Sequence, residues 1–210
     1  ADSIDDLDLL RHGAMSRVFT GVRAPSTLGT FLRSFTHGHV QQLDKVNRGL
    51  LTGLVAQVPD LLAGAGASSG SGSSGVPENG SGGQDGQGGR GLTFIDVDDT
   101  IREVHGHAKQ GAAVGYTRVR GMNIQLATIS TPTAAPVLAG ARLRRGNIAS
   151  FSGAARMVTQ AIGVARDTGA TGPHGPVLVR ADSAYFGAAF VNAALRQGAW
   201  FSVTARLNTR

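Results

Sequence analysis

An apolar run ends in carboxylates at Leu92-Thr93-Phe94-Ile95-Asp96-Val97-Asp98-Asp99-Thr100. A second run, Val177-Leu178-Val179-Arg180-Ala181-Asp182-Ser183-Ala184-Tyr185, ends in the same way. Both runs are typical of buried strands, in which a carboxylate is costly unless something neutralises it. A divalent cation held between the two strand ends would do so. We therefore expect a metal-dependent enzyme that acts on phosphate esters.

Strand alternation gives the carboxylates of the first run different expected roles. Asp96 and Asp98 share one face of the strand, so geometry alone does not choose between them. Asp99 points the other way, and we expect it to be a solvated or capping residue. Asp98 and Asp182 on adjacent strands would repel each other unless cations intervene, which makes physical sense of a Mg²⁺ site.

The charge of the chain favours a polyanionic partner. The 210 residues carry a formal net charge of +6, and the calculated pI is about 10.9. Residues 92–210 hold thirteen basic and six acidic residues, so this half carries the surplus positive charge.

There is no cysteine, which excludes disulfides and thiolate metal sites. No apolar run approaches the roughly 20 residues that cross a bilayer, so we expect a cytoplasmic protein with no membrane partner.

Three regions differ in composition. Residues 1–63 read as a small helical N-terminal module, with apolar positions at helical spacing. Residues 64–91 are rich in glycine and serine, which predicts a flexible linker. Residues 92–210 predict an α/β domain with a mixed sheet. Its expected elements are strands at 92–98, 121–130 and 136–143, a helix at 151–168, a strand at 177–182, a helix at 186–197 and a strand at 199–205.

The connection lengths constrain how these strands pair. The first three strands are joined without helices and should pair antiparallel, whereas the helical crossovers make the last two strands parallel to a neighbour. This is the order of an RNase H-like sheet. The strand at 92–98 should then lie between the antiparallel 121–130 strand and the parallel 177–182 strand.

Two other functions compete with the metal-dependent nuclease chemistry. Asp-x-Asp-x-Thr at 96–100 resembles the first motif of haloacid dehalogenase-type phosphatases, in which Asp96 would be the nucleophile. Alternatively the chain is a non-catalytic DNA-binding remnant, in which Asp182 and Ser183 only cap the following helix. Strand order separates the phosphatase from the RNase H-like enzyme.

Several stretches resemble one family, the DDE transposases of bacterial insertion sequences, in particular the insertion sequence 1380 family. They are Asp5-Asp6-Leu7-Asp8, Leu10-Arg11-His12-Gly13, the segment 23–31, Asp96-Val97-Asp98-Asp99-Thr100, Leu143-Arg144-Arg145-Gly146-Asn147 and Arg180-Ala181-Asp182-Ser183-Ala184-Tyr185. The resemblance covers nearly the whole chain outside the linker. Its Asp-x-Thr and Arg-Ala-Asp-Ser pieces are the most specific.

The resemblance implies DNA transposition, with metal-dependent cleavage of element ends and strand transfer to target DNA. Asp98 and Asp182 would be the first two catalytic carboxylates and would bind Mg²⁺ or Mn²⁺. The partner would be double-stranded DNA, in the bacterial nucleoid, and the full-length protein would form a homodimer. Arg144, Arg145 and Arg180 are candidate contacts to DNA phosphates.

The chain departs from the family in its third carboxylate. The family carries a glutamate on a later helix, whereas the only glutamates here are Glu78 and Glu103. We therefore expect a domain incomplete at its C-terminus, a truncated transposase that is inactive, or very slow, in strand transfer by itself.

Overall fold

The structure is a computed structural model of the whole chain, and it describes residues 4–62, 91–105, 109–132, 134–172 and 174–205. It divides into two compact units, Ala1–Leu43 and Asp44–Arg210. The predicted linker at 64–91 falls almost entirely outside the described residues. None of the described helices is long and apolar enough to cross a membrane.

The first unit consists of short helices. They are the 3-10 helix η1 (Ile4–Asp6), α1 (Leu7–Arg11), the 3-10 helix η2 (Gly13–Arg17), α2 (Pro25–Arg33) and the beginning of α3 (His37–Gln57). Proline is at the first position of α2, where its missing N–H costs nothing. Phe31 and Leu32 remain about half exposed on this helix.

The second unit is an α/β domain built on a six-stranded mixed sheet, consistent with an RNase H-like fold. Its elements are the rest of α3, the 3-10 helix η3 (Pro59–Leu62), β1 (Thr93–Glu103), β2 (Ala113–Val114), β3 (Arg120–Ser130), β4 (Val137–Arg145), α4 (Ala154–Asp167), β5 (Val177–Ala181), the 3-10 helix η4 (Ser183–Tyr185), α5 (Ala188–Arg196) and β6 (Trp200–Val203). The main path through the sheet is β4–β3–β1–β5–β6, and the short β2 pairs with the beginning of β3.

Strand β1 lies in the middle of this sheet. It pairs antiparallel with β3 and parallel with β5, and β6 continues the parallel side. Alternation is strict in β3, where every second residue from Gly121 to Ile129 is buried. The same face of β1 carries the fully buried Ile95 and the nearly buried Val97.

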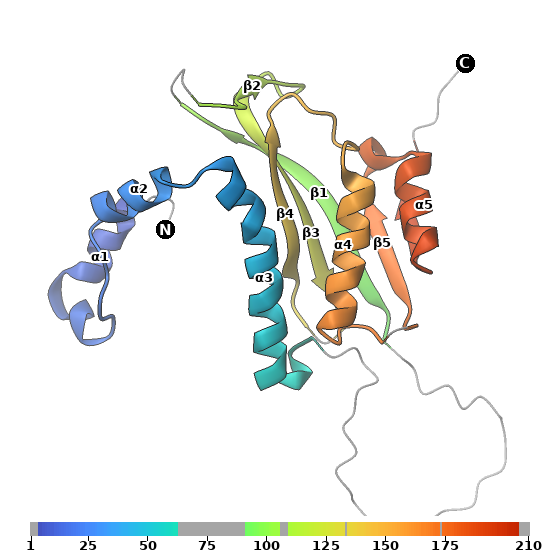
Figure 1. Cartoon of the computed structure of the whole chain (residues 1–210), viewed down its shortest axis with the longest axis horizontal. Helices are drawn as coiled ribbons and strands as arrows, with labels where there is room; N and C mark the ends of the chain where they lie inside the picture. Colours follow the sequence, from blue (N-terminus) through green and yellow to red (C-terminus); the bar gives the residue numbers. More distant parts are fainter. Residues whose placement is uncertain (1–3, 63–90, 106–108, 133, 173, 206–210) are drawn as a thin grey trace, which may run out of the picture. The chain divides into compact units, whose positions relative to one another are not determined.

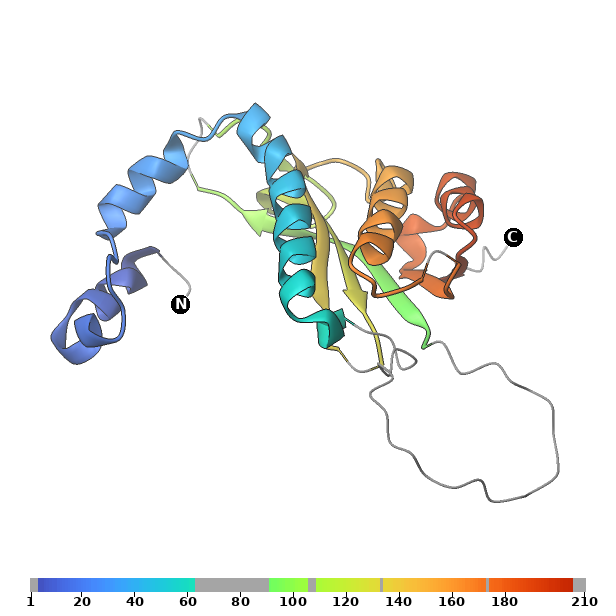
Figure 2. The ribbon, with the colours of Figure 1, turned by 60° about the horizontal axis from the view of Figure 1, so that its bottom comes forward.

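Helices α4 and α5 cover the buried face of the sheet (Figures 1 and 2). An apolar stripe of α4 forms the centre of the core, and its fully or almost fully buried members are Ala154, Met157, Val158, Ala161, Ile162, Val164 and Ala165. The opposite face of β1, with Asp96, Asp98 and Thr100, is partly or fully exposed.

The division between the units differs from the predicted module boundary at residues 63 and 64. Asp44 and the residues after it belong to the second unit, which contains the sheet. Leu51 and the fully buried Leu62 are part of its core, and the Asn47 Nδ2 donates to the carbonyl oxygen of Leu138 at 2.8 Å. The second half of α3 is thus a packing element of the α/β domain.

Candidate active site

The backbone ladder between β1 and β5 ends just before the two predicted metal ligands. Val97 and Ala181 are the last residues in register, and Asp98 and Asp182 follow them directly. Neighbouring strands are about 5 Å apart, so two residues that leave a parallel ladder at the same level start close together. Both aspartates are exposed. Asp182 remains extended, with φ −78° and ψ −178°.

Each of these carboxylates has one oxygen held by a backbone N–H. The amide of Asp99 donates to Asp98 Oδ1 at 2.8 Å, and the amide of Ala184 donates to Asp182 Oδ1 at 2.9 Å. Asp182 thus caps η4 rather than a longer helix, since α5 begins only at Ala188. Within the described part of the chain, the structure records no hydrogen bond to the second oxygen of either carboxylate. A cation could bind these two oxygens.

A cleft of about 810 Å³ opens beside the part of β1 that extends past β5. Asp98 and Asp182 both line it, together with Asp99, Thr100, Ile101, Glu103, Tyr116, Thr117, Val119, Asn123, Gly146, Ile148, Ala149, Ser150 and Ala184. Its wall includes the turn after β4, where a Cβ at Gly146 would overlap the carbonyl oxygen of Gly121. This turn therefore requires glycine.

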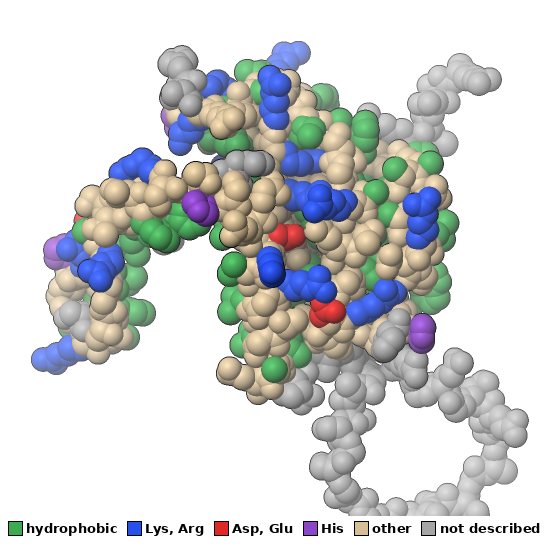
Figure 3. All heavy atoms as spheres, viewed as in Figure 1, with side chains coloured by type: hydrophobic (Ala, Val, Ile, Leu, Met, Phe, Trp, Pro, Cys, Tyr) green, Lys and Arg blue, Asp and Glu red, His purple; other side chains and the backbone are tan. Residues whose placement is uncertain are grey.

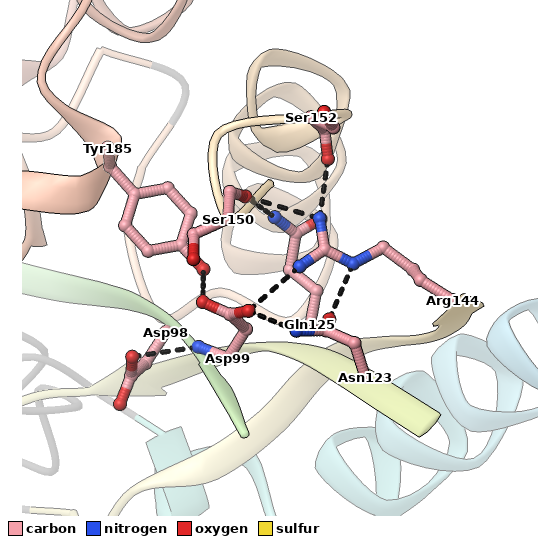
Figure 4. Close-up of polar contacts among 8 residues, drawn as sticks. All are labelled: Asp98, Asp99, Asn123, Gln125, Arg144, Ser150, Ser152 and Tyr185. Atoms are coloured by element: carbon pink, nitrogen blue, oxygen red, sulfur yellow. Dashed lines mark hydrogen bonds and ion pairs between the residues drawn. The ribbon is translucent and has the colours of Figure 1, made fainter. Parts of the chain in front are cut away.

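Asp99 lies at the centre of a buried polar network beside this cleft (Figure 4). The Tyr185 hydroxyl donates to Asp99 Oδ1 at 2.9 Å, and Arg144 Nη2 donates to Asp99 Oδ2 at 3.1 Å. Asn123 Nδ2 also donates to Asp99 Oδ2. The Asp99 side chain is only 11 % exposed. The alternation predicted its direction correctly, but the expectation of a solvated or capping residue was wrong.

Arg144 completes the network and is not free for DNA. Its side chain is 7 % exposed, and besides Asp99 it donates to Asn123 Oδ1 at 2.7 Å and to the carbonyl oxygens of Ser150 and Ser152 at 3.2 and 2.6 Å. The candidate phosphate contact at Arg144 is therefore corrected to a structural ion pair. Alternation along β4 turns this side chain towards the helices.

Burial shifts the pKa values of two members of this network. It lowers the pKa of Arg144 from its ordinary value, an effect that the charge of Asp99 opposes. Burial raises the pKa of the fully buried Tyr185, and the hydrogen bond to Asp99 adds to the increase. Both causes follow from the cost of placing charge in a poorly solvated site.

The other two candidate phosphate contacts differ from each other. Arg180 is bound in a bidentate pair by Asp96, with Nε to Oδ1 at 2.6 Å and Nη2 to Oδ2 at 2.7 Å, and it stacks 4.5 Å from the ring centroid of Phe94. Arg145 is exposed. It lies beside Met122 in the register of β3 and β4, and Arg102 lies on the other side of Met122 in the register of β1 and β3.

The described residues offer a cation two carboxylates rather than a complete cage. Among them, no group of three or more histidine, aspartate or glutamate side chains is placed to hold a metal ion. Asp98 and Asp182 nevertheless fit Mg²⁺ or Mn²⁺ chemically, because Mg²⁺ commonly binds one or two carboxylates and keeps several waters. Glu103 lines the same cleft, but it lies five residues beyond Asp98 along β1.

The polar character of the site left a signal in the sequence. Asn123 and Gln125 occupy consecutive positions on the buried face of β3, where polar side chains need partners. Gln125 donates to the carbonyl oxygen of Ser150 at 3.0 Å, which holds the same loop as Arg144. Polar residues at buried strand positions could therefore have indicated a network.

Comparison with known proteins yields little. No family model matches the sequence, and no curated protein matches it. One solved structure, the Mos1 transposase paired-end complex with left transposon end, aligns with 95 % of this chain at 8 % identity and a TM-score of 0.32. This chain spans 57 % of the length of that chain. A TM-score of 0.32 does not establish a common fold.

Proposed function

We propose that this chain carries the RNase H-like catalytic domain of a DDE transposase, related to the insertion sequence 1380 family, and that Asp98 and Asp182 bind Mg²⁺ or Mn²⁺. One observation supports the proposal above all. Strand β1 lies between the antiparallel β3 and the parallel β5, so both aspartates directly follow the last residues in register between β1 and β5, and both line the same cleft.

The chemistry of this site is an in-line phosphodiester displacement. A bound divalent cation would supply Lewis acidity at the phosphate and neutralise the two aspartates. Asp98 and Asp182 would hold that cation at the cleft, where the scissile phosphate would lie. A water oxygen would form the new bond to phosphorus, the bond to the 3′ oxygen would break, and the proton lost by water would balance the one that the 3′ oxygen takes up. In strand transfer, that 3′ hydroxyl would replace water as the attacking group at a phosphorus of the target DNA, the bond from that phosphorus to the target's 3′ oxygen would break, and this oxygen would take up a proton to balance the one that the hydroxyl loses.

Duplex DNA is the proposed partner. Basic side chains spread over the face of the sheet unit that carries α4, with few acidic side chains between them (Figure 3). Arg145 and Arg102 form a second basic pair, on the opposite face of the sheet and beyond Asp98 along β1. Contacts of this kind neutralise phosphates without reading sequence, so binding should weaken steeply with salt.

The phosphatase alternative has less support from this geometry. Its nucleophile would be Asp96, but both carboxylate oxygens of Asp96 accept hydrogen bonds from Arg180. A doubly wound phosphatase sheet would also place a helix after its first strand, whereas β1 is followed by the short β2 and the antiparallel β3.

Metal-dependent nicking of a supercoiled plasmid tests the proposal. Nicking that requires Mg²⁺ or Mn²⁺ should be weak, because no group of three or more histidine, aspartate or glutamate side chains in the part of the chain that the structure describes is placed to hold a cation. It should disappear in Asp98→Asn and in Asp182→Asn. Asp96→Asn is the matched control, since it makes the same change on the same face of the same strand, and it should retain the activity. Salt-sensitive DNA binding with no metal effect would instead favour the non-catalytic remnant.

The same assay also checks whether a third carboxylate is needed. Fast, complete strand transfer by this chain alone, lost in Asp182→Asn, would show that two carboxylates suffice and that no third is required. Loss of activity in Asp96→Asn with retention in Asp98→Asn would support the phosphatase-type nucleophile.

A further inference from the structure

The parallel pairing of β1 with β5 ends one residue before the two proposed ligands, so backbone pairing does not set their relative positions. Val97 and Ala181 are paired, and Asp98 and Asp182 are not. Beyond this point a side-chain bond joins the two segments, because the Tyr185 hydroxyl of η4 donates to Asp99 of β1 at 2.9 Å. This bond connects the residue after the first ligand to the third residue after the second ligand.

The two residues that this bond joins also belong to the segments that orient the ligands. The amide of Asp99 holds Asp98 Oδ1. The amide of Ala184, next to Tyr185, holds Asp182 Oδ1. A movement of Asp99 relative to Tyr185 would therefore turn both carboxylates and change the distance between their free oxygens.

Further contacts of Arg144 and Tyr185, away from the two proposed ligands, hold the Asp99–Tyr185 bond in place. Arg144 binds Asp99, Asn123 and the carbonyl oxygens of Ser150 and Ser152, so one guanidinium joins β1, β3, β4 and the loop before α4 (Figure 4). Tyr185 is fully buried and packs 5.9 Å from Phe190, measured between ring centroids. The positive charge of Arg144 also neutralises Asp99, so the Asp99 carboxylate, which lines the same cleft, is paired within the protein.

We infer that Asp99, Arg144 and Tyr185 are positioning residues that set the separation and orientation of the Asp98 and Asp182 carboxylates for a shared divalent cation. The inference rests on the proposed function of those two aspartates. Outer partners of metal ligands commonly change metal affinity by ten-fold or more when they are removed, although they never touch the metal.

A Mn²⁺ titration of the full chain, followed by paramagnetic broadening of its backbone amide signals, tests the inference. In the wild-type chain, the signals near Asp98 and Asp182 should broaden first, and Asp98→Asn should abolish this. Tyr185→Phe removes one hydroxyl and should weaken Mn²⁺ binding about ten-fold. Asp99→Asn, which keeps the size of the side chain but not its charge, is the second variant.

Thr93→Val is the matched control. Thr93 is also fully buried and lies at the other end of β1. Its hydroxyl donates at 2.6 Å to the carbonyl oxygen of Ala170. Each variant removes the hydroxyl of a fully buried residue that makes one hydrogen bond at β1, so both should lower the thermal midpoint. Only a positioning role predicts weaker Mn²⁺ binding in Tyr185→Phe with unchanged binding in Thr93→Val.

The outcomes separate the inference from the function on which it rests. If wild type binds Mn²⁺ at Asp98 and Asp182, and both Tyr185→Phe and Asp99→Asn bind it as tightly as Thr93→Val, the positioning role is overturned and the metal site stands. If wild type shows no broadening localised to these aspartates, the proposed metal site fails and the positioning role fails with it.

Discussion

Arg144 and Arg180 each bind an aspartate of β1, but they do so on opposite faces of the sheet and with different exposure to solvent. The side chains of Arg144 and Asp99 are 7 % and 11 % exposed, whereas those of Arg180 and Asp96 are 44 % and 39 % exposed. The exposed pair has the better geometry, with two short parallel hydrogen bonds. The buried pair has more partners, since Tyr185 and Asn123 also bind its carboxylate.

This difference shows that geometry and energetic importance need not agree. An exposed ion pair gives up little when it breaks, because water replaces the partner. A buried pair cannot be broken on one side without leaving a charge in a site that water does not reach. Asp96 and Asp99 lie on either side of Asp98 along β1. Variants of the two pairs therefore compare a buried and an exposed ion pair next to the same proposed ligand.

The largest expected effect is that of Arg144→Leu. It leaves the buried Asp99 without its counter-ion, and we expect the free energy of unfolding to fall by about 3–5 kcal/mol. Urea denaturation followed by far-UV circular dichroism measures this loss.

Adding Asp99→Asn to Arg144→Leu provides the control. It removes the uncompensated charge and should restore part of the stability, so the two changes should be strongly non-additive. If the two losses simply add, Asp99 and Arg144 are not coupled and the network described above is not a unit.

Lysine substitution sharpens the comparison at constant charge. Arg144→Lys keeps the cation but cannot reproduce hydrogen bonds to Asp99, Asn123 and the 150–152 loop at once, and we expect a loss of about 1.5–3 kcal/mol. Arg180→Lys should change stability by less than about 0.5 kcal/mol, because the exposed site is solvated. Equal losses in the same urea experiment would contradict the distinction between the two pairs.

Alkaline pH should test the buried site through Tyr185. Its pKa is raised in the folded chain, chiefly by burial, while the unfolded chain ionises near the ordinary value of about 10. The unfolded state then holds fewer protons than the native state above pH 10. Stability is therefore full below that pH and falls as pH rises beyond it, by at most about 1.4 kcal/mol per pH unit.

Ultraviolet absorbance isolates this ionisation, because the chain contains only two tyrosines. In Tyr116→Phe the remaining tyrosinate signal belongs to Tyr185, and it should appear together with unfolding at high pH. The stability of Tyr185→Phe should lack this tyrosine-linked decline. A Tyr185 signal that titrates near pH 10 in the folded chain would contradict the burial of its hydroxyl, which is the chief cause of the raised pKa.

Much of the sheet could be predicted from strand patterns and connection lengths. The alternation of Ile95 and Val97 with Asp96 and Asp98 gives the direction of each side chain, and the absence of helices between the first strands dictates antiparallel pairing. These are local properties, so a single sequence shows them.

The partners of Arg144 could not be predicted in this way. They depend on the lateral register of β4 against β3, which shifts at an irregularity between Ala127 and Thr128. No periodicity within β4 reveals that shift. The unit boundary was missed for a related reason, since the composition of the linker does not show that Leu51 and Leu62 pack into the core.

Arg180→Ala should have the smallest effect, a loss of about 0–1 kcal/mol in the free energy of unfolding. Half-exposed charges are screened by salt, so the difference from wild type should shrink further in 1 M NaCl, where the Debye length is about 3 Å. The loss in Arg144→Leu should persist there, because the buried pair is poorly screened. Urea denaturation of both variants at low and high salt measures the contrast. A salt-insensitive loss of several kcal/mol in Arg180→Ala would mean that the Asp96 pair, despite its exposure, helps to hold β1 against β5.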